Sequence, residues 1–197
     1  VKGDSISISM EAITRLPVDF ELESVSFSPW NIHQDFSQRM RENEKLVTDF
    51  KFQVPLDMPL SHPYWLNDKA SLGMYHVDDP DQIGKPENDT PFSARFVIKW
   101  EDQFLEVERP VVYKYNDPVK GEVYQPVVIT PKATVNLDAS VLVFGDPKPR
   151  TVDARVKAWQ NDVRGTLVLS APNGWKIQPA EIPVEMSLKG EEKLLQF

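Results

Sequence analysis

The chain has 197 residues, 41% of them hydrophobic, and carries a formal net charge of −8 at pH 7. This charge repels the phosphates of nucleic acids and anionic lipids, and lysine and arginine form no basic patch, so we predict no nucleic-acid partner. The absence of cysteine excludes disulfides and thiolate chemistry, and no apolar run reaches the roughly 20 residues of a membrane-spanning helix.

The N-terminal part alternates polar and apolar residues with a period of two, which is typical of β-strands. The predicted strands, in chain order, are 5–11, 18–23, 46–54, 92–100 and 104–115. Residues 35–45 are rich in Gln, Arg, Glu and Asn, and Phe36 and Met40 have helical spacing. We expect a mobile polar connection with one helical turn there. A long loop-rich passage is expected over residues 61–91, because three prolines interrupt the strand pattern.

The C-terminal part shows short predicted strands separated by frequent turn signals. The strands are 133–144, 151–159, 165–170, 175–178 and 182–188. A turn signal, Asn-Asp-Pro, stands at 116–118, and residues 121–131 are interpreted as the passage into a second domain. We therefore predict an all-β protein of two consecutive immunoglobulin-like β-sandwich domains, 1–120 and 121–197, the first with a long loop insertion.

Three histidines are enough for a zinc site with one open position. His33, His62 and His76 lie in different loop segments and lack the short spacing of ligands on one element. We interpret them as surface or loop-packing histidines and predict no metal site among them.

An acidic passage supplies enough oxygen atoms for a structural calcium ion. It contains Asp78, Asp79 and Asp81, and residues 87–89 follow. The spacing is not that of an EF-hand loop, and a solvated loop is the alternative interpretation.

Glu106 and Glu108 share one face of a predicted strand, which resembles the paired carboxylates of glycosidases. Glycosidase pairs come from different strands around a cleft, whereas these two have no second wall, so we interpret them as surface charge. The sequence contains no nucleophile elbow, P-loop or dinucleotide-binding motif. We predict no catalytic residues in this chain.

Trp30, Tyr64 and Trp65 fall in or beside predicted loops. Exposed rings of this kind stack against pyranose faces in sugar-binding proteins. The alternative is that they bury apolar area and anchor the long loop passage to the first sandwich, and we favour this packing role.

Four segments occur in a recognisable order: 63–66 (PYWL), 73–75 (GMY), 83–88 (IGKPEN) and 113–122 (YKYNDPVKGE). They resemble the non-catalytic middle-to-C-terminal region of large bacterial LmbE-like (PIG-L) deacetylases, especially those of Bacteroidetes. Residues 151–197, with the PNGW turn at 172–175, resemble the immunoglobulin-like NEW3 domain, which is associated with alpha-galactosidases and other carbohydrate-active enzymes.

The resemblance implies an accessory or scaffold module beside the catalytic domain of a zinc-dependent amino-sugar N-deacetylase that acts on glycans. That catalytic domain binds zinc through a His-Pro-Asp-Asp motif. Here His62 and Pro63 are followed by Tyr64 and Trp65, so no catalytic role is carried over.

The partners implied by the resemblance are the catalytic domain of the same polypeptide and glycans, in the periplasm or outside the cell. A carbohydrate-binding module that uses Trp30, Tyr64 and Trp65 is the alternative. NEW3-like domains usually run one or two strands past residues 194–197, so we expect the second sandwich to be truncated. The start at Val1 shows no signal-peptide leader, as expected of a processed or partial chain.

Overall fold

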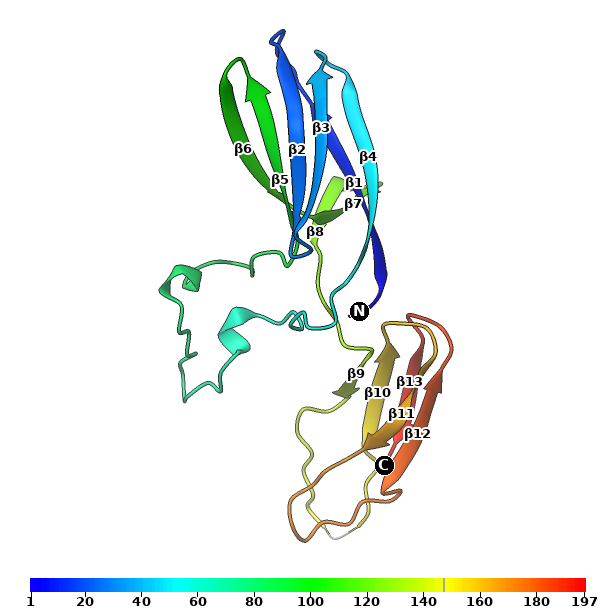
Figure 1. Cartoon of the computed structure of the whole chain (residues 1–197). Coiled ribbons are helices and arrows are strands. Elements are labelled where there is room, and N and C mark those ends of the chain that lie inside the picture. Colours follow the sequence, from blue (N-terminus) through cyan, green and yellow to red (C-terminus); the bar gives the residue numbers. More distant parts are fainter. Residues whose placement is uncertain (147) are drawn as a thin grey trace. The chain divides into compact units, whose positions relative to one another are not determined.

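The computed structural model describes residues 1–146 and 148–197, and it confirms the predicted all-β class. Within these ranges the only helical elements are two short 3-10 turns, η1 (Tyr64–Leu66) and η2 (Pro80–Gln82) (Figure 1). The chain divides into two compact units, Lys2–Ile129 and Thr130–Phe197.

The core of the unit Lys2–Ile129 is a sandwich of two antiparallel sheets (Figure 1). In one sheet β1 (Ser5–Ile13) pairs with β4 (Lys45–Gln53). The other has the order β3-β2-β5-β6, with β2 (Phe20–Ser28), β3 (Ile32–Met40), β5 (Ser93–Trp100) and β6 (Gln103–Pro110). The buried side chains of both sheets form one core: Ile8, Met10, Leu22, Val25, Phe27, Met40, Phe52 and Ala94. The alternation in the sequence thus places one face of each sheet in this core.

The expected polar connection with a helical turn over residues 35–45 is wrong. Its first half belongs to β3, which pairs with β2 along its length. A spacing of four residues, as between Phe36 and Met40, also places two side chains on one face of a strand, so it did not discriminate helix from strand. β3 is an edge strand with mostly exposed residues, which explains its polar composition.

The single strand predicted over 104–115 is two strands in the structure. β6 ends at Pro110, and the backbone N–H of Val111 donates to the carbonyl of Phe92 at 2.9 Å. The chain then forms a hairpin of β7 (Val112–Asp117) and β8 (Gly121–Pro126). The sequence-based domain boundary between 120 and 121 falls in the turn of this hairpin, whereas the two units divide between Ile129 and Thr130.

The carboxylate of Asp117 closes the β7–β8 turn by accepting backbone hydrogen bonds from Val119 and Lys120, both at 2.8 Å. These bonds favour the charged carboxylate and lower the pKa of Asp117. We predict that NMR titration gives a pKa below the roughly 3.9 of an unperturbed aspartate. A lowered pKa stabilises the hairpin at neutral pH, and this contribution is lost as the pH falls through the folded-state value. Asp117→Asn should remove it, and an ordinary pKa for Asp117 would contradict this account of the turn.

The unit Thr130–Phe197 is a smaller sandwich (Figure 1). Its sheets have the orders β13-β10-β9 and β11-β12, with β9 (Ala133–Leu137), β10 (Asp153–Ala158), β11 (Val163–Val168), β12 (Glu181–Met186) and β13 (Glu192–Gln196). Val156 and Ala158 of β10 pack against Val163 of β11 and against Val184 and Met186 of β12.

Three strand predictions in this unit need correction. The predicted strand 133–144 is a strand only up to Leu137, residues 175–178 form no strand, and β13 was not predicted. β13 carries charged residues beside its apolar ones and lacks a clean alternation. It is held by its pairing with β10, where Lys157 and Glu192 form a cross-strand ion pair at 2.8 Å.

Candidate functional site

The β4–β5 insertion, residues 54–92, contains most of the site residues predicted from the sequence. It leaves and re-enters the sandwich at a small buried cluster of Val54, Phe92 and Ile129. Near its start the N–H of Ser61 donates to the carbonyl of Ile129 at 2.8 Å, and the N–H of Ile129 donates to the Ser61 hydroxyl at 2.9 Å. Both ends of the insertion are therefore anchored to the first unit.

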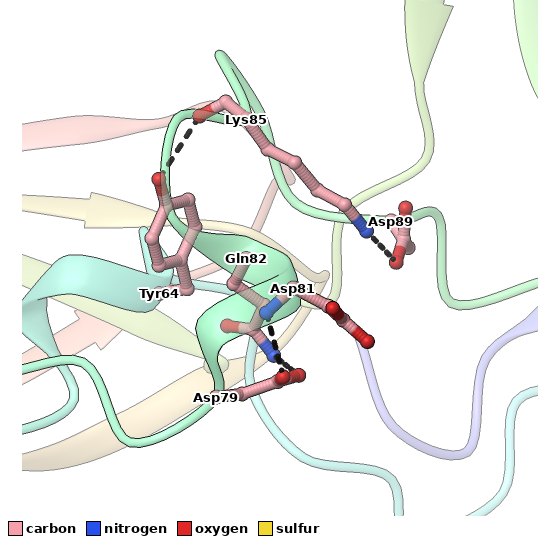
Figure 2. A network of polar contacts seen from close by, with 6 residues as sticks. All are labelled: Tyr64, Asp79, Asp81, Gln82, Lys85 and Asp89. Atoms are coloured by element: carbon pink, nitrogen blue, oxygen red, sulfur yellow. Dashed lines mark hydrogen bonds and ion pairs between the residues drawn. The ribbon is translucent and has the colours of Figure 1, made fainter.

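Asn88 clamps two segments of the insertion together. Its side-chain amide donates to the carbonyl of His62 at 2.8 Å, and its side-chain oxygen accepts from the N–H of Tyr64 at 3.0 Å. The Tyr64 hydroxyl donates to the carbonyl of Lys85 at 3.0 Å, and Lys85 pairs with Asp89 at 2.9 Å (Figure 2). The hydrogen bond and charge of Asp89 raise the pKa of Lys85. This network gives the insertion local order without a core of its own.

The carboxylates of the acidic residues predicted to bind calcium do not converge on one point. Asp79 and Asp78 instead contact neighbouring residues of the insertion. The carboxylate of Asp79 accepts from the N–H of Asp81 at 3.0 Å and from the side chain of Gln82 at 3.1 Å, so it caps η2 (Figure 2). The carboxylate Oδ1 of Asp78 lies 3.3 Å from Nε2 of His76. Within residues 1–146 and 148–197, no group of three or more histidine or carboxylate side chains is arranged to hold a metal ion.

Trp30 is partly buried and packs against the core of the first unit. Its ring stacks between Phe52, with centroids 4.5 Å apart, and Phe92, at 4.7 Å, and its indole N–H donates to the carbonyl of Gln53 at 2.7 Å. Both faces of the ring are therefore covered, and neither is free to stack on a sugar.

Tyr64 and Trp65 are adjacent, half-buried rings at 87° to each other, with centroids 4.9 Å apart. A sugar-binding platform presents ring faces side by side, so this perpendicular pair does not form one. The three aromatic residues predicted as a platform are not brought together as such.

Glu108 lies opposite Arg95 on the neighbouring strand and Glu106 lies diagonal to it, and their carboxylates are 3.5 and 3.6 Å from the Arg95 guanidinium. Glu108 also accepts a hydrogen bond from the Ser93 hydroxyl at 2.6 Å, and this bond, with the charge of Arg95, lowers the pKa of Glu108. The two carboxylates thus stabilise cross-strand pairing on the sheet surface.

The sequence analysis missed the exposed apolar residues of the insertion. Leu72, Met74 and Tyr75, which we call the apolar turn, are exposed, and Leu72 is fully so. Ser71 and Met74 close the turn with reciprocal backbone bonds of 3.0 and 3.4 Å, and Gly73 has the positive φ of 83° that a type II turn requires at this position. The available signal was an apolar run inside a loop that no alternating pattern explains.

The insertion is strongly acidic. Residues 54–92 contain seven carboxylates and two lysines, a net −5 of the chain's −8. The apolar turn is therefore carried by an acidic segment.

No protein-family model, curated protein or solved structure matches this chain. The part of the chain that the structure describes also contains no helix long and apolar enough to cross a membrane.

Proposed function

We propose that this chain is a non-catalytic scaffold module of a zinc-dependent amino-sugar N-deacetylase that acts on glycans in the periplasm or outside the cell. The module holds the catalytic domain of the same polypeptide through the β4–β5 insertion. The observation that carries the proposal is the apolar turn, exposed on a segment whose two ends are anchored in a buried cluster.

The apolar turn contributes nothing to the core of its own unit while it is exposed to water. Burying a leucine, methionine or similar side chain in a partner contributes about 1.5–3 kcal/mol. Tyr75 brings an aromatic ring, and aromatic residues and methionine are enriched in protein interfaces. The surrounding net −5 favours a partner surface with a basic rim around an apolar hollow.

The segments that resemble LmbE-like proteins also support this location. Three of them, 63–66, 73–75 and 83–88, lie in the insertion, and 73–75 contains Met74 and Tyr75 of the apolar turn. The packing of the sandwich core does not require these residues. Their resemblance to LmbE-like proteins therefore needs another explanation, and contact with a partner domain provides one.

Carbohydrate binding is a second candidate, favoured by one observation on β7. Tyr113 and Tyr115 stack with their centroids 5.6 Å apart, and Tyr113 is exposed. Titration of the chain with bacterial and host glycans tests this role, and the loss of binding in Tyr113→Ala would locate it on this pair.

The experiment for the scaffold role is calorimetric titration of this chain with the deacetylase domain expected in the same open reading frame. Leu72→Asp should weaken binding by at least about tenfold, as for a central interface residue. Leu188→Asp, which changes another exposed leucine in the second unit, is the matched control and should leave the affinity unchanged. Binding should also weaken with added salt, because opposite charges are screened.

Three results would contradict the scaffold role. They are an open reading frame without a deacetylase domain, no binding heat with that domain, and equal affinities for the wild type and Leu72→Asp. Asn88→Ala provides a further check, because it loosens the clamp of the insertion without touching the core and should lower the affinity while the sandwich keeps its melting temperature.

A further inference from the structure

The smaller sandwich is open along one side. A groove of about 340 Å³ enters it between β9 and β11, and apolar residues of four strands line it, including Val135, Val156, Leu167 and Val184. β9 and β11 are edge strands, and in the described ranges of the chain no strand bonds to their outer edges (Figure 1). The groove therefore combines an apolar floor with unpaired backbone groups, which together form a template for a further strand.

The inward-facing residues of β9 indicate that a neighbouring strand is missing on its outer side. Val135 and Leu137 lie on the same face as buried Val156 and Ala154, with which they pair, yet they remain 47% and 46% exposed. Side chains on a strand inside a sheet have cross-strand neighbours on both sides, whereas those of an edge strand such as β9 have them on one side. An added strand beside β9 would cover both.

The same unit also contains an exposed apolar segment that forms no strand in the described part of the chain. Residues 139–144 (ASVLVF) are separated from β9 by Asp138 alone and have the β-branched, apolar composition of a strand, but they form none. Val141 and Val143 are 76% and 74% exposed, more than the other large hydrophobic residues of this unit. Two residues apart, they would share one face of an extended chain.

We propose that two copies of this chain pair through these segments, so that residues 139–144 of each copy lie antiparallel along β9 of the other. The arrangement is isologous, with the two-fold axis beside Ala139. In this register Leu137 is opposite Val141 of the second copy, and Val135 is opposite Val143. The two half-exposed residues of β9 thus meet the two exposed valines on the groove side.

Charge complementarity supports the same register. Lys132, which stands at the end of the groove, comes opposite Asp146 of the second copy, and Asp138 comes opposite Ser140. An opposite-charge pair and a pair that can hydrogen bond therefore flank the apolar contacts. A shift of one residue would turn the valines away from the groove and lose the Lys132–Asp146 pair.

The test is sedimentation velocity of the full chain from about 1 μM to about 1 mM, a range that covers typical weak and moderate dimers. We expect a monomer–dimer equilibrium. Val143→Lys should raise the dimer dissociation constant by at least about tenfold, because it places a charge in the apolar groove. Val119→Lys, the same change at an exposed valine of the β7–β8 turn, should leave it unchanged.

Cross-linking tests the register independently, because the chain contains no cysteine. Ala139→Cys lies at the two-fold axis, where strand pairing brings the two Cα atoms to about 4.5–5.5 Å, within the range of a disulfide. Under mild oxidation it should form a covalent dimer much faster than Leu188→Cys. A monomer at every concentration, equal effects of the two valine substitutions, or equal cross-linking rates of the two cysteines would each overturn the proposal.

Discussion

Replacing Phe27 with alanine is expected to lower the free energy of unfolding of the unit Lys2–Ile129 by about 3–5 kcal/mol. Phe27 is buried on β2, and its ring centroid lies 4.7 Å from that of Phe50 and 4.9 Å from that of Phe52, both on β4. The ring therefore connects the two sheets of the sandwich, and its removal leaves a cavity between them. Urea denaturation monitored by tryptophan fluorescence measures the change, because Trp30 stacks on Phe52.

The matched control for Phe27 is Phe104→Ala. Phe104 is exposed on the edge strand β6, so its truncation should cost no more than about 0.5 kcal/mol. Single domains are typically stable by about 5–15 kcal/mol, so the loss at Phe27 would remove a large share of the total. Equal losses for the two variants would contradict the core assigned to this sandwich.

Replacing Trp30 with alanine is expected to be about as damaging, at about 3–5 kcal/mol. Trp30 packs against both the main core of the first unit and the cluster of Val54, Phe92 and Ile129 that anchors the insertion. Trp30→Phe keeps an aromatic ring between Phe52 and Phe92 but loses the hydrogen bond to Gln53, and should cost less, at about 1 kcal/mol for that bond. Chemical denaturation of the three proteins gives these differences.

The stability loss of Trp65→Ala, compared with that of Trp30→Ala, tests whether Trp30 packs against the core. Trp65 is half-buried and contacts Tyr64 in the insertion, outside the core clusters, so its loss should cost about 1 kcal/mol or less. If Trp65→Ala destabilised the protein more than Trp30→Ala, the placement of Trp30 between two phenylalanines would be contradicted.

The all-β class could be predicted because it depends on a local pattern. In β1 and β5 one face packs against the core, so alternation appears directly in the sequence. β3 was missed because an edge strand with little buried surface has no need for apolar residues on either face. The strand predicted over 133–144 was too long because its second half has strand composition but pairs with no strand of residues 1–146 and 148–197, and pairing is not a local property.

The candidate sites were harder to predict because they depend on long-range contacts. Trp30 is covered by Phe52 and Phe92, which are distant in the sequence, and no local pattern distinguishes such a ring from an exposed one. Asp79 binds backbone and side-chain groups two and three residues away, so its role in a loop was compatible with the sequence but not distinguishable from a calcium ligand. The exposure of Leu72 follows from the path of the insertion, which composition does not specify.

Hydrogen–deuterium exchange tests the central claim most directly, with the chain measured alone, with the deacetylase domain proposed for its polypeptide and with soluble glycans. The amides of residues 71–75 belong to a short exposed turn, so they should exchange rapidly in the free chain. The scaffold role predicts that the deacetylase domain slows exchange at these amides, while glycans do not. Unchanged exchange at 71–75 with the domain present, or slowing by glycans alone at Tyr113 and Tyr115, would contradict it.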